Sequence, residues 1–381
     1  YLYFNKMSSF NVAQILPSLS SGGVERGTIE VSNYLSKLKI KNYIISNGGS
    51  LENELNKNYT KHFQLSVHSK NFFHYPFIAN KLKNIIEINN INLVHLRSRA
   101  PAWILSFIKN KNFKTISTFH NVYSGNSYFK KVYNKQLSNV DQIVAISSYV
   151  KNEIIKKYNL DSNKITVINR GVDVEYFDKE ILDDEIESTI NKFKIDTSKK
   201  IILYPSRLTN WKGQLEFLDI FNKIKNSDIL LYFVGDTKNQ SYATKLKNKI
   251  NTLNLNNRCK ILGNLNRNDI KILYYLSTVV ASFPIQEEGF GRTISEALIM
   301  NKKIIAFNYG GVKDQLKNLN DIYKVDPHQY GDIELKLNNI IEIDREKFSN
   351  ISSFSRDYII KSFSKSQMVE NYIKLYEQQS I

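Results

Sequence analysis

Two glutamates flank a glycine-containing segment in the C-terminal half of the chain. Glu288 and Glu296 stand eight positions apart, and Gly289 and Gly291 lie between them. Glycine lets the backbone approach a ligand closely, and the free N–H groups at the start of the helix expected next attract phosphate. A glutamate about one turn into that helix leans back toward its N-terminus. Carboxylates that accept from hydroxyls on either side of a bound phosphate describe a site for a sugar nucleotide.

Two cations follow another apolar run. Arg207 and Lys212 come after residues 201–205, which indicate a buried strand, and the loop between them is polar with one aromatic residue. The planar fork of arginine and the mobile charge of lysine together suit the two phosphates of a diphosphate. They would offset the charge that develops on such a leaving group. Exposed cations are the commoner explanation for any such pair, but the strand–loop–helix position favours a site.

Gly22 and Gly23 are a weaker candidate for phosphate binding. They follow the strand-like run 12–16 and open a predicted helix, so the N–H groups of that helix start could face an anion. Paired glycines more often form only a turn. The sequence alone therefore leaves both interpretations open.

Histidine and arginine residues end further predicted strands in the same half. His120 follows the run 115–119, and His95 also stands at a strand end. Either could line a ligand cleft, although a lone histidine is usually structural. Arg97 and Arg99 come just beyond His95, and they are either cations for an anionic acceptor or simple surface charge.

Alternating strands and helices position these residues. In the first half, strands are predicted over 12–16, 43–46, 93–96, 115–119 and 142–146, and helices over 23–37, 78–88 and 147–158. In the second half, strands are predicted over 201–205, 229–234, 260–262, 279–283 and 304–307, and helices over 214–225, 242–253, 270–276 and 293–300. Such alternation implies parallel sheets of class α/β, with ligand crevices at the carboxyl ends of the strands.

The length and the patterning predict two domains. A chain of 381 residues is long for one core. The alternation fades into a charged stretch over 178–198, so we expect an N-terminal domain over 7–178 and a C-terminal domain over 199–363. Residues 364–381 are expected to form a helix with apolar side chains on one side. Residues 1–6 precede the first methionine and are left out of the fold prediction.

The charge of the chain is high and uneven. The net charge is +17, and residues 1–178 carry 23 Lys/Arg against 11 Asp/Glu. Basic surfaces attract nucleic acid, phosphorylated glycans or anionic lipid. A general bias toward lysine is the alternative for the total charge, but it explains the asymmetry less well. A nucleic-acid binding protein is the least favoured class, because no recognised binding motif is present.

The composition argues against several other classes of protein. No apolar run approaches the roughly 20 residues that cross a bilayer, and no signal-peptide pattern is present at the N-terminus. A single cysteine, Cys259, excludes an internal disulfide framework. No cluster of histidine, cysteine or acidic residues has metal-ligand spacing, so we expect no catalytic metal.

The motifs together resemble the retaining glycosyltransferases of family 4, which have the GT-B fold. Any one match would be weak, but they occur in the family's order from residue 12 to residue 315. The segments that carry the resemblance are Ser21-Gly22-Gly23-Val24-Glu25-Arg26, Ser117-Thr118-Phe119-His120, Asn169-Arg170-Gly171-Val172-Asp173 with Phe177, Arg207 with Lys212-Gly213, and the E-x7-E run from Glu288 to Glu296.

The resemblance implies two Rossmann-like doubly wound domains that face a central cleft, with the C-terminal helix crossing back to the first domain. Glu288 would accept hydrogen bonds from hydroxyls of the donor sugar, in a loop shared with Gly289. The backbone N–H groups of Phe290 and Gly291 would assist, and Glu296 would bind the ribose hydroxyls.

The family pattern gives roles to four further positions. The amide of Gly23, beside Gly22, would face the donor diphosphate. His120 would contact the donor sugar through its side chain or its carbonyl. Asn264 and Leu265, after the strand that ends at 262, would contact the base through backbone atoms.

The function implied is that of a retaining hexosyltransferase with a nucleotide diphosphate sugar, in the first instance a UDP-sugar, as donor and with no further cofactor. Catalysis would rest on Glu288, His120, Arg207 and Lys212, and no protein nucleophile is expected. An epimerase that acts on sugar nucleotides would keep the same fold. Donor isomerisation in the absence of an acceptor would distinguish the two.

The acceptor is the open part of the prediction. The basic first half favours a bacterial enzyme peripheral to an anionic membrane surface, at the inner face of the cytoplasmic membrane. Lipopolysaccharide core or another envelope glycan is the first expectation, and a diacylglycerol-type glycolipid is the alternative. The aromatic run 72–77 could enter lipid, although packing at a helix start is the favoured interpretation.

Overall fold

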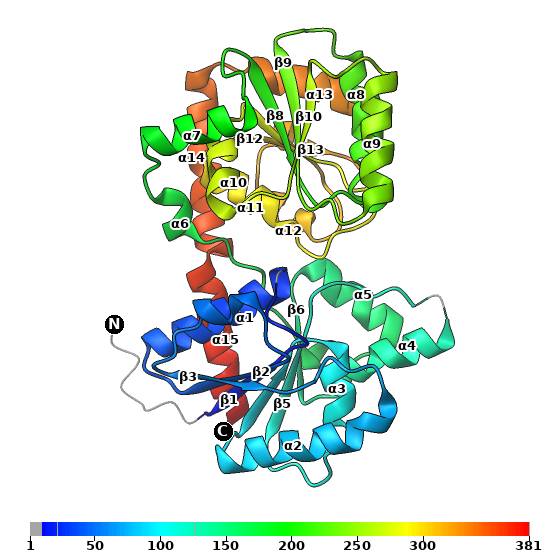
Figure 1. Ribbon diagram of the computed structural model, residues 1–381, viewed down its shortest axis with the longest axis vertical. Coiled ribbons are helices and arrows are strands. Elements are labelled where there is room, and N and C mark those ends of the chain that lie inside the picture. The colour runs from blue at the N-terminus through cyan, green and yellow to red at the C-terminus, as the bar shows by residue number, and fades with distance from the viewer. Residues whose placement is uncertain (1–9, 21, 126, 381) are drawn as a thin grey trace. The chain divides into compact units, whose positions relative to one another are not determined.

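The computed structural model describes residues 10–20, 22–125 and 127–380, and it divides into two compact units (Figure 1). The N-terminal unit takes the chain up to Gly171 and again from Lys365. The C-terminal unit is Val172–Ser364. The predicted glycine-loop residue Ser21 lies outside the described residues.

The N-terminal unit is built on a seven-stranded parallel sheet of order β3-β2-β1-β4-β5-β6-β7. Every residue of β1, β2 and β4 is buried, as expected of a parallel sheet covered on both faces. The order reverses between β1 and β4, which is where an open α/β sheet forms a crevice. The strands are β1 (Val12–Ile15), β2 (Asn42–Ser46), β3 (Thr60–Gln64), β4 (Leu93–Leu96), β5 (Lys114–Phe119), β6 (Gln142–Ala145) and β7 (Ile165–Val167).

The helices of this unit include the last helix of the chain. The core of the unit joins Phe10, Val12 and Leu35 to Tyr372 and Tyr376 of α15. The predicted return of the C-terminal helix to the first domain is therefore confirmed. The helices are α1 (Gly23–Lys37), α2 (Tyr75–Ile88), α3 (Arg99–Leu105), α4 (Tyr128–Lys135), α5 (Ser148–Tyr158) and α15 (Lys365–Ser380), with 3-10 turns at Ser50–Glu54, Phe72–His74, Gln136–Ser138 and Ser162–Lys164.

The C-terminal unit is built on a six-stranded parallel sheet of order β10-β9-β8-β11-β12-β13, which reverses between β8 and β11. The strands are β8 (Lys200–Pro205), β9 (Ile229–Val234), β10 (Cys259–Gly263), β11 (Val279–Ser282), β12 (Lys303–Phe307) and β13 (Lys324–Val325). The helices are α6 (Val174–Asp178), α7 (Asp183–Phe193), α8 (Gln214–Lys223), α9 (Gln240–Thr252), α10 (Arg267–Leu276), α11 (Arg292–Ile299), α12 (Val312–Leu316), α13 (Tyr330–Glu342) and α14 (Arg345–Phe363), with 3-10 turns at Asn210–Lys212 and Asp321–Tyr323.

The charged stretch 178–198 is not an interruption of the pattern, because most of it forms α7. Three acids open this helix, where they favour the partial positive charge of its N-terminus. Its buried Thr189 and its Lys192 both bond to Asp269 of α10, the latter at 2.7 Å. The prediction missed this helix because charged residues dominate the stretch and obscure the helical spacing of Ile186, Ile190 and Phe193, which are half-buried.

The chain passes between the units earlier than the predicted boundary at 178. The N–H of Val172 donates to the carbonyl of Phe363 at 2.8 Å, so the outgoing and returning segments run side by side. Asp173 then accepts from Arg267 at 2.9 Å, within the C-terminal unit. Among the described residues, no helix is both long and apolar enough to cross a membrane.

Candidate functional site

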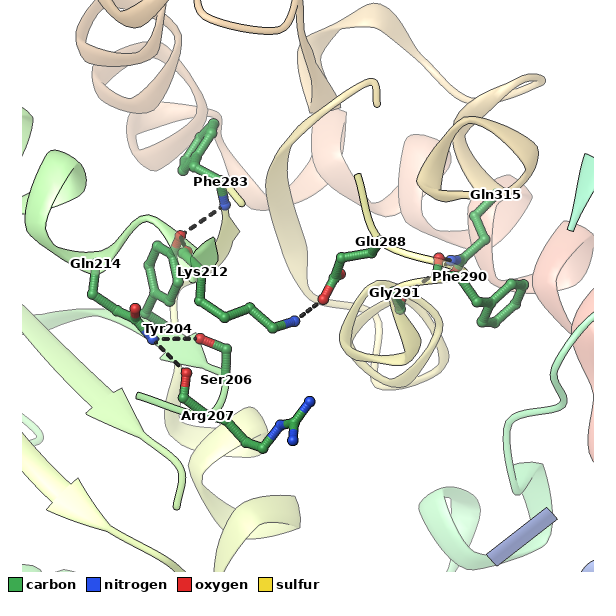
Figure 2. Close-up of polar contacts among 10 residues, drawn as sticks. All are labelled: Tyr204, Ser206, Arg207, Lys212, Gln214, Phe283, Glu288, Phe290, Gly291 and Gln315. Atoms are coloured by element: carbon green, nitrogen blue, oxygen red, sulfur yellow. Dashed lines mark hydrogen bonds and ion pairs between the residues drawn. The ribbon is translucent and has the colours of Figure 1, made fainter. Parts of the chain in front are cut away.

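The two strongest sequence motifs meet at the switch point of the C-terminal sheet. Arg207 and Lys212 follow β8, and Glu288 follows β11, the strand beside it. The Nζ of Lys212 forms an ion pair with Oε1 of Glu288 (Figure 2). Ligands of open α/β sheets bind at the carboxyl ends of the strands at this place.

The Lys212–Glu288 pair is largely withdrawn from water. Its side chains are 14% and 9% exposed. Burial, together with the positive charge of Arg207, lowers the pKa of Lys212, whereas contact with a carboxylate favours the charged ammonium. Withdrawing such a pair from water is costly. A bound phosphate would give Lys212 a second anionic partner, and the fold already holds this cation at the site.

Tyr204 of β8 ties the two loops together. Its hydroxyl donates to the carbonyl of Lys212 at 2.7 Å and accepts from the N–H of Phe283 at 2.9 Å (Figure 2). Gly213 has a φ of 77°, and a Cβ there would overlap the carbonyl of Phe283. Glycine at this position therefore allows the loops to approach.

Gln214 fixes the start of the loop that carries Arg207 and Lys212. Its Nε2 donates to Ser206 Oγ and to the carbonyl of Arg207, both at 2.9 Å, and its Oε1 accepts from Tyr242 at 3.0 Å. The backbone of Arg207 is held, while its side chain stays exposed. Figure 2 shows the guanidinium extending from this loop on its own, outside the dashed contacts.

The glycine segment of the E-x7-E run is held by a buried amide. Gln315 of α12 is fully buried, and its Nε2 donates to the carbonyls of Phe290 and Gly291 at 2.5 and 3.1 Å (Figure 2). Its Oε1 accepts from Ser295. These contacts set the geometry of the loop that carries Glu288.

Gly291 places that loop against the start of α11. It caps the helix with a φ of 84°, and a Cβ there would lie 2.6 Å from Val312 Cγ2 and 3.2 Å from Oε2 of Glu288. The Glu288 carboxylate therefore lies beside a helix N-terminus, a favourable place for an anion.

A second glycine pair, Gly310 and Gly311, packs against the loop that carries Glu288. The N–H of Gly311 donates to the carbonyl of Glu288 at 2.8 Å, and a Cβ on Gly311 would overlap the carbonyl of Gly289. The prediction from sequence missed Gly310 and Gly311, although they show the signal used at Gly22 and Gly23: a glycine pair between an apolar run and a helix.

Glu296 lies one turn into α11, as predicted from its spacing. Tyr274 donates to its Oε2 at 3.0 Å, and Arg292 lies 3.6 Å from its Oε1. Asn264 and Leu265 follow β10, two strands away from β8. Their part in binding a base stays a prediction.

In the N-terminal unit, an acid occupies the predicted phosphate position. Gly22 has a φ of 139° and Gly23 begins α1, but a Cβ on Gly22 would lie 2.5 Å from Oε2 of Glu25. Burial raises the pKa of Glu25. An anion that reached this helix start would meet that carboxyl group, so phosphate binding by Gly22 and Gly23 stays a prediction.

His120 is held as a neutral ring with one defined tautomer. Nη2 of Arg170 lies 2.8 Å from its Nδ1. Since a guanidinium can only donate, Nδ1 accepts and the ring proton is assigned to Nε2. Burial and the charges of Arg170 and Arg97 hold the pKa of His120 well below its usual value. The ring can thus donate a hydrogen bond from Nε2.

His95 does not line a cleft, and Arg97 is neither an accessible cation for an acceptor nor surface charge, because both residues are buried. His95 is fully buried, with Nδ1 2.6 Å from the Tyr376 hydroxyl and Nε2 2.7 Å from Thr118 Oγ1. Arg97 is 1% exposed, and its Nη1 donates to Tyr372 at 3.2 Å. Both residues anchor α15.

Arg99 differs from these two because it is only partly buried. It donates to Asn134 at 2.7 Å and lies over the ring of Tyr123. Within the residues that the structure describes, no three histidine, cysteine or acidic side chains are grouped as metal ligands would be.

Comparison with known proteins gives this arrangement a family. The family described as Glycosyltransferase Family 4 matches residues 21–176, and that described as Glycosyl transferases group 1 matches residues 185–357. A solved glycosyltransferase from Rickettsia africae ESF-5 is 36% identical over 97% of this chain and 98% of its own, with a TM-score of 0.87. The chain belongs to the family 4 glycosyltransferases, with the GT-B fold.

Two more distant matches differ in how much of each chain they cover. The Anabaena HepE protein, solved in complex with UDP and glucose, is 18% identical over 96% of this chain and 99% of its own, with a TM-score of 0.80; this likeness shows the fold alone. A trehalose synthase from Pyrococcus horikoshii is 26% identical over 61% of this chain, but the match spans only 56% of that relative.

Proposed function

We propose that this glycosyltransferase is a retaining hexosyltransferase that uses a nucleoside diphosphate sugar, in the first instance a UDP-sugar. The observation that carries the proposal is the buried Lys212–Glu288 pair, set beside the N-terminus of α11 at the switch point of its sheet. A cation for phosphate, a carboxylate for hydroxyls and a helix start for an anion are the groups that such a donor needs.

The residues of this unit divide the donor between them. Arg207, whose side chain is exposed, and Lys212 would bind the diphosphate and offset its growing charge as the glycosidic bond breaks. Glu288 would then turn from Lys212 to the sugar hydroxyls, and Glu296 would accept from the ribose. No further cofactor and no metal take part in the proposal.

The proposed chemistry is the same-face attack that the family resemblance implies, and it uses no protein nucleophile. The acceptor hydroxyl would attack on the face from which the diphosphate leaves, and a phosphate oxygen would take its proton. The configuration at the anomeric carbon would be retained. Proton NMR of the first product formed would show an axial anomeric configuration from an axial donor; an inverted product would overturn the retaining mechanism.

Donor identity is tested by thermal unfolding with UDP-, GDP- and ADP-sugars, because a bound ligand stabilises the folded state by mass action. UDP-sugars should raise the melting temperature of the wild-type chain, and Lys212→Met should remove that rise. UDP bound by HepE supports this choice of nucleotide. A rise of equal size in the variant would contradict the role of Lys212.

For the acceptor we propose a glycan of the bacterial cell envelope such as lipopolysaccharide core, met at the inner face of the cytoplasmic membrane. A diacylglycerol-type glycolipid is the alternative. The support is the basic N-terminal half, with 23 Lys/Arg against 11 Asp/Glu in residues 1–178. Transfer from the donor found above to each acceptor class, measured with and without EDTA, tests both the acceptor and the proposed independence from metal.

A further inference from the structure

The N-terminal unit exposes a set of large apolar side chains at the start of α2, the end of α3 and along α4. The exposed fractions are 93% for Phe73, 82% for Phe129, 76% for Tyr128 and 65% for Phe77. Side chains of this size are rarely left so open, and grouped ones mark an interaction site. We call this the aromatic–lysine surface; its other apolar members are Phe72, Phe107 and Val132.

Ring contacts join the three segments into one surface. Phe72 packs edge-on against Trp103 at 5.2 Å between centroids, and Trp103 stacks on Tyr133 of α4 at 6.0 Å. The indole N–H of Trp103 also donates to the carbonyl of Tyr133 at 3.0 Å. Phe129 stands one turn before Tyr133 on α4. The exposed rings of α2 and α4 therefore flank a common, partly buried aromatic base.

Lysines are interleaved with the exposed rings. The Nζ of Lys81 lies 4.4 Å from the ring centroid of Phe77, and α4 carries Lys130, Lys131 and Lys135 among its aromatic residues. Residues 55–140 hold 13 Lys/Arg, of which Arg97 is buried, and a single acid, Glu87. The surface is thus both apolar and strongly cationic.

This mixture distinguishes between possible partners. The centre of a protein interface is depleted of lysine, whereas here lysines stand between the aromatic side chains. At a lipid surface, a lysine can bury its stem while its ammonium reaches a headgroup phosphate. Aromatic side chains combined with Lys and Arg are the composition of elements that lie in the membrane interface.

We propose that the aromatic–lysine surface seats this protein on an anionic lipid bilayer. Phe73, Phe77 and Phe129 would enter the interfacial region, and the lysines would contact lipid phosphates. The inference deepens the proposed function. It rests on that function in one respect, namely that the acceptor is reached at a membrane. The favoured expectation for the aromatic run 72–77 holds for Tyr75, which is buried at the helix start with Phe72 against it, but Phe73 and Phe77 are exposed.

The test is flotation of the full chain with vesicles of phosphatidylcholine alone and with 30% phosphatidylglycerol added. Binding should require the anionic lipid and weaken between 0.1 and 0.5 M salt. Each lysine near an anionic surface contributes about five-fold in affinity. Lys130→Gln with Lys131→Gln should therefore weaken binding at least ten-fold, as should Phe73→Ser with Phe77→Ser.

Matched controls come from the C-terminal unit. Leu335 and Phe354 are 64% and 58% exposed, and Lys245 and Lys247 are exposed on α9. Serine at the first pair and glutamine at the second should leave vesicle binding within two-fold of wild type. Thermal unfolding of every variant, with and without UDP-sugar, separates loss of folding or of donor binding from loss of membrane binding.

Three results would overturn the assignment. They are equal binding to neutral vesicles, equal loss in the control variants, and a wild-type dimer that becomes monomeric in Phe73→Ser with Phe77→Ser while vesicle binding is absent throughout. The last result would make the surface a contact between copies of the chain. Donor-induced stabilisation that persists in any of these cases would leave the proposed function standing.

Discussion

Both sheets bury a cation at the point where their strand order reverses, but the partners of the two cations differ. In the N-terminal unit, Arg97 follows β4 and bonds to neutral oxygens of Gln14, on the neighbouring strand β1, and of Tyr372. In the C-terminal unit, Lys212 follows β8 and pairs with the carboxylate of Glu288, in the loop after β11. The same topological position holds a structural anchor in one unit and a candidate ligand site in the other.

The two sites differ in whether the partner of the cation can move away to make room for a ligand. Gln14 stands in a fully buried strand and Tyr372 in the core, so Arg97 cannot exchange partners without opening the unit. Glu288 stands in a glycine loop, and Arg207 nearby leaves its side chain exposed. A charge after a strand therefore indicates a ligand site only where its partner lies on a loop.

Glu288→Gln should have the largest effect on activity. Removing a group that acts on the reacting sugar should lower turnover about 10²- to 10³-fold. The free energy of unfolding should also fall by about 3 kcal/mol, because Lys212 would be left buried without its carboxylate. Initial rates and urea unfolding measure the two effects, with Glu287→Gln as the neighbouring control. Near-normal transfer by Glu288→Gln would defeat the site.

Arg97→Met should act on stability instead of ligand binding. It leaves the Gln14 and Tyr372 oxygens buried without their donor, which should cost about 2 to 4 kcal/mol of unfolding free energy. The rise in melting temperature caused by UDP-sugar should persist, whereas Lys212→Met should lose it. Urea unfolding with and without donor measures this, and the exposed Lys245→Met is the control. A stable Arg97→Met chain with impaired acceptor use would reverse the comparison.

Gln315→Leu should loosen the loop of the candidate site without touching a ligand. Two carbonyls and Ser295 lose their partner, so we expect turnover to fall about ten-fold, equivalent to ~1.4 kcal/mol, with a higher KM for donor. Gln315→Glu should be worse, since a carboxylate would face the same carbonyl oxygens. Steady-state kinetics measure both, beside the exposed Gln240→Leu. Wild-type kinetics in Gln315→Glu would contradict the positioning role.

The last effect concerns pH and the N-terminal anchor. Burial holds the pKa values of His95 and His120 well below the usual 6.5, so below that pH the unfolded chain binds protons that the folded chain does not. Stability should be full above pH 6.5 and fall as the pH drops below it, by at most about 1.4 kcal/mol per pH unit for each histidine.

Unfolding in urea between pH 7.5 and 5.5 measures that slope. His95→Gln should make it shallower, and the exposed His68→Gln should leave it unchanged. A slope that is equal in both variants would show that His95 does not carry the proton difference.

Sequence patterning predicted the buried strands and the loops of the candidate site, because parallel strands are continuous apolar runs. The predicted 93–96 and 229–234 match β4 and β9 to the residue. Strand β3, with the sequence Thr-Lys-His-Phe-Gln, was missed because it lies at the sheet edge and is only partly buried. Helix α14 was missed because its apolar residues follow the helical period only weakly.

The support of the site could not be predicted from local sequence. Gln315 lies 24 positions after Gly291, and Tyr204 lies 79 positions before Phe283. Arg97 and His95 fit a ligand cleft by position, but tyrosines from a helix more than 270 positions away bury them. Such contacts depend on the assembled fold, and no period or spacing records them.

The shared core of α15 and the first unit has a consequence for synthesis on the ribosome. Residues 365–380 supply six side chains to the cluster that also contains Phe10 and Val12. The unit translated first is therefore the last to be completed, after all of Val172–Ser364 has emerged. Until then one apolar face of its sheet is not covered by α15, and Arg97 and His95 lack the tyrosine hydroxyls that they bond to in the folded unit. A chaperone that shields nascent chains would find its binding site there.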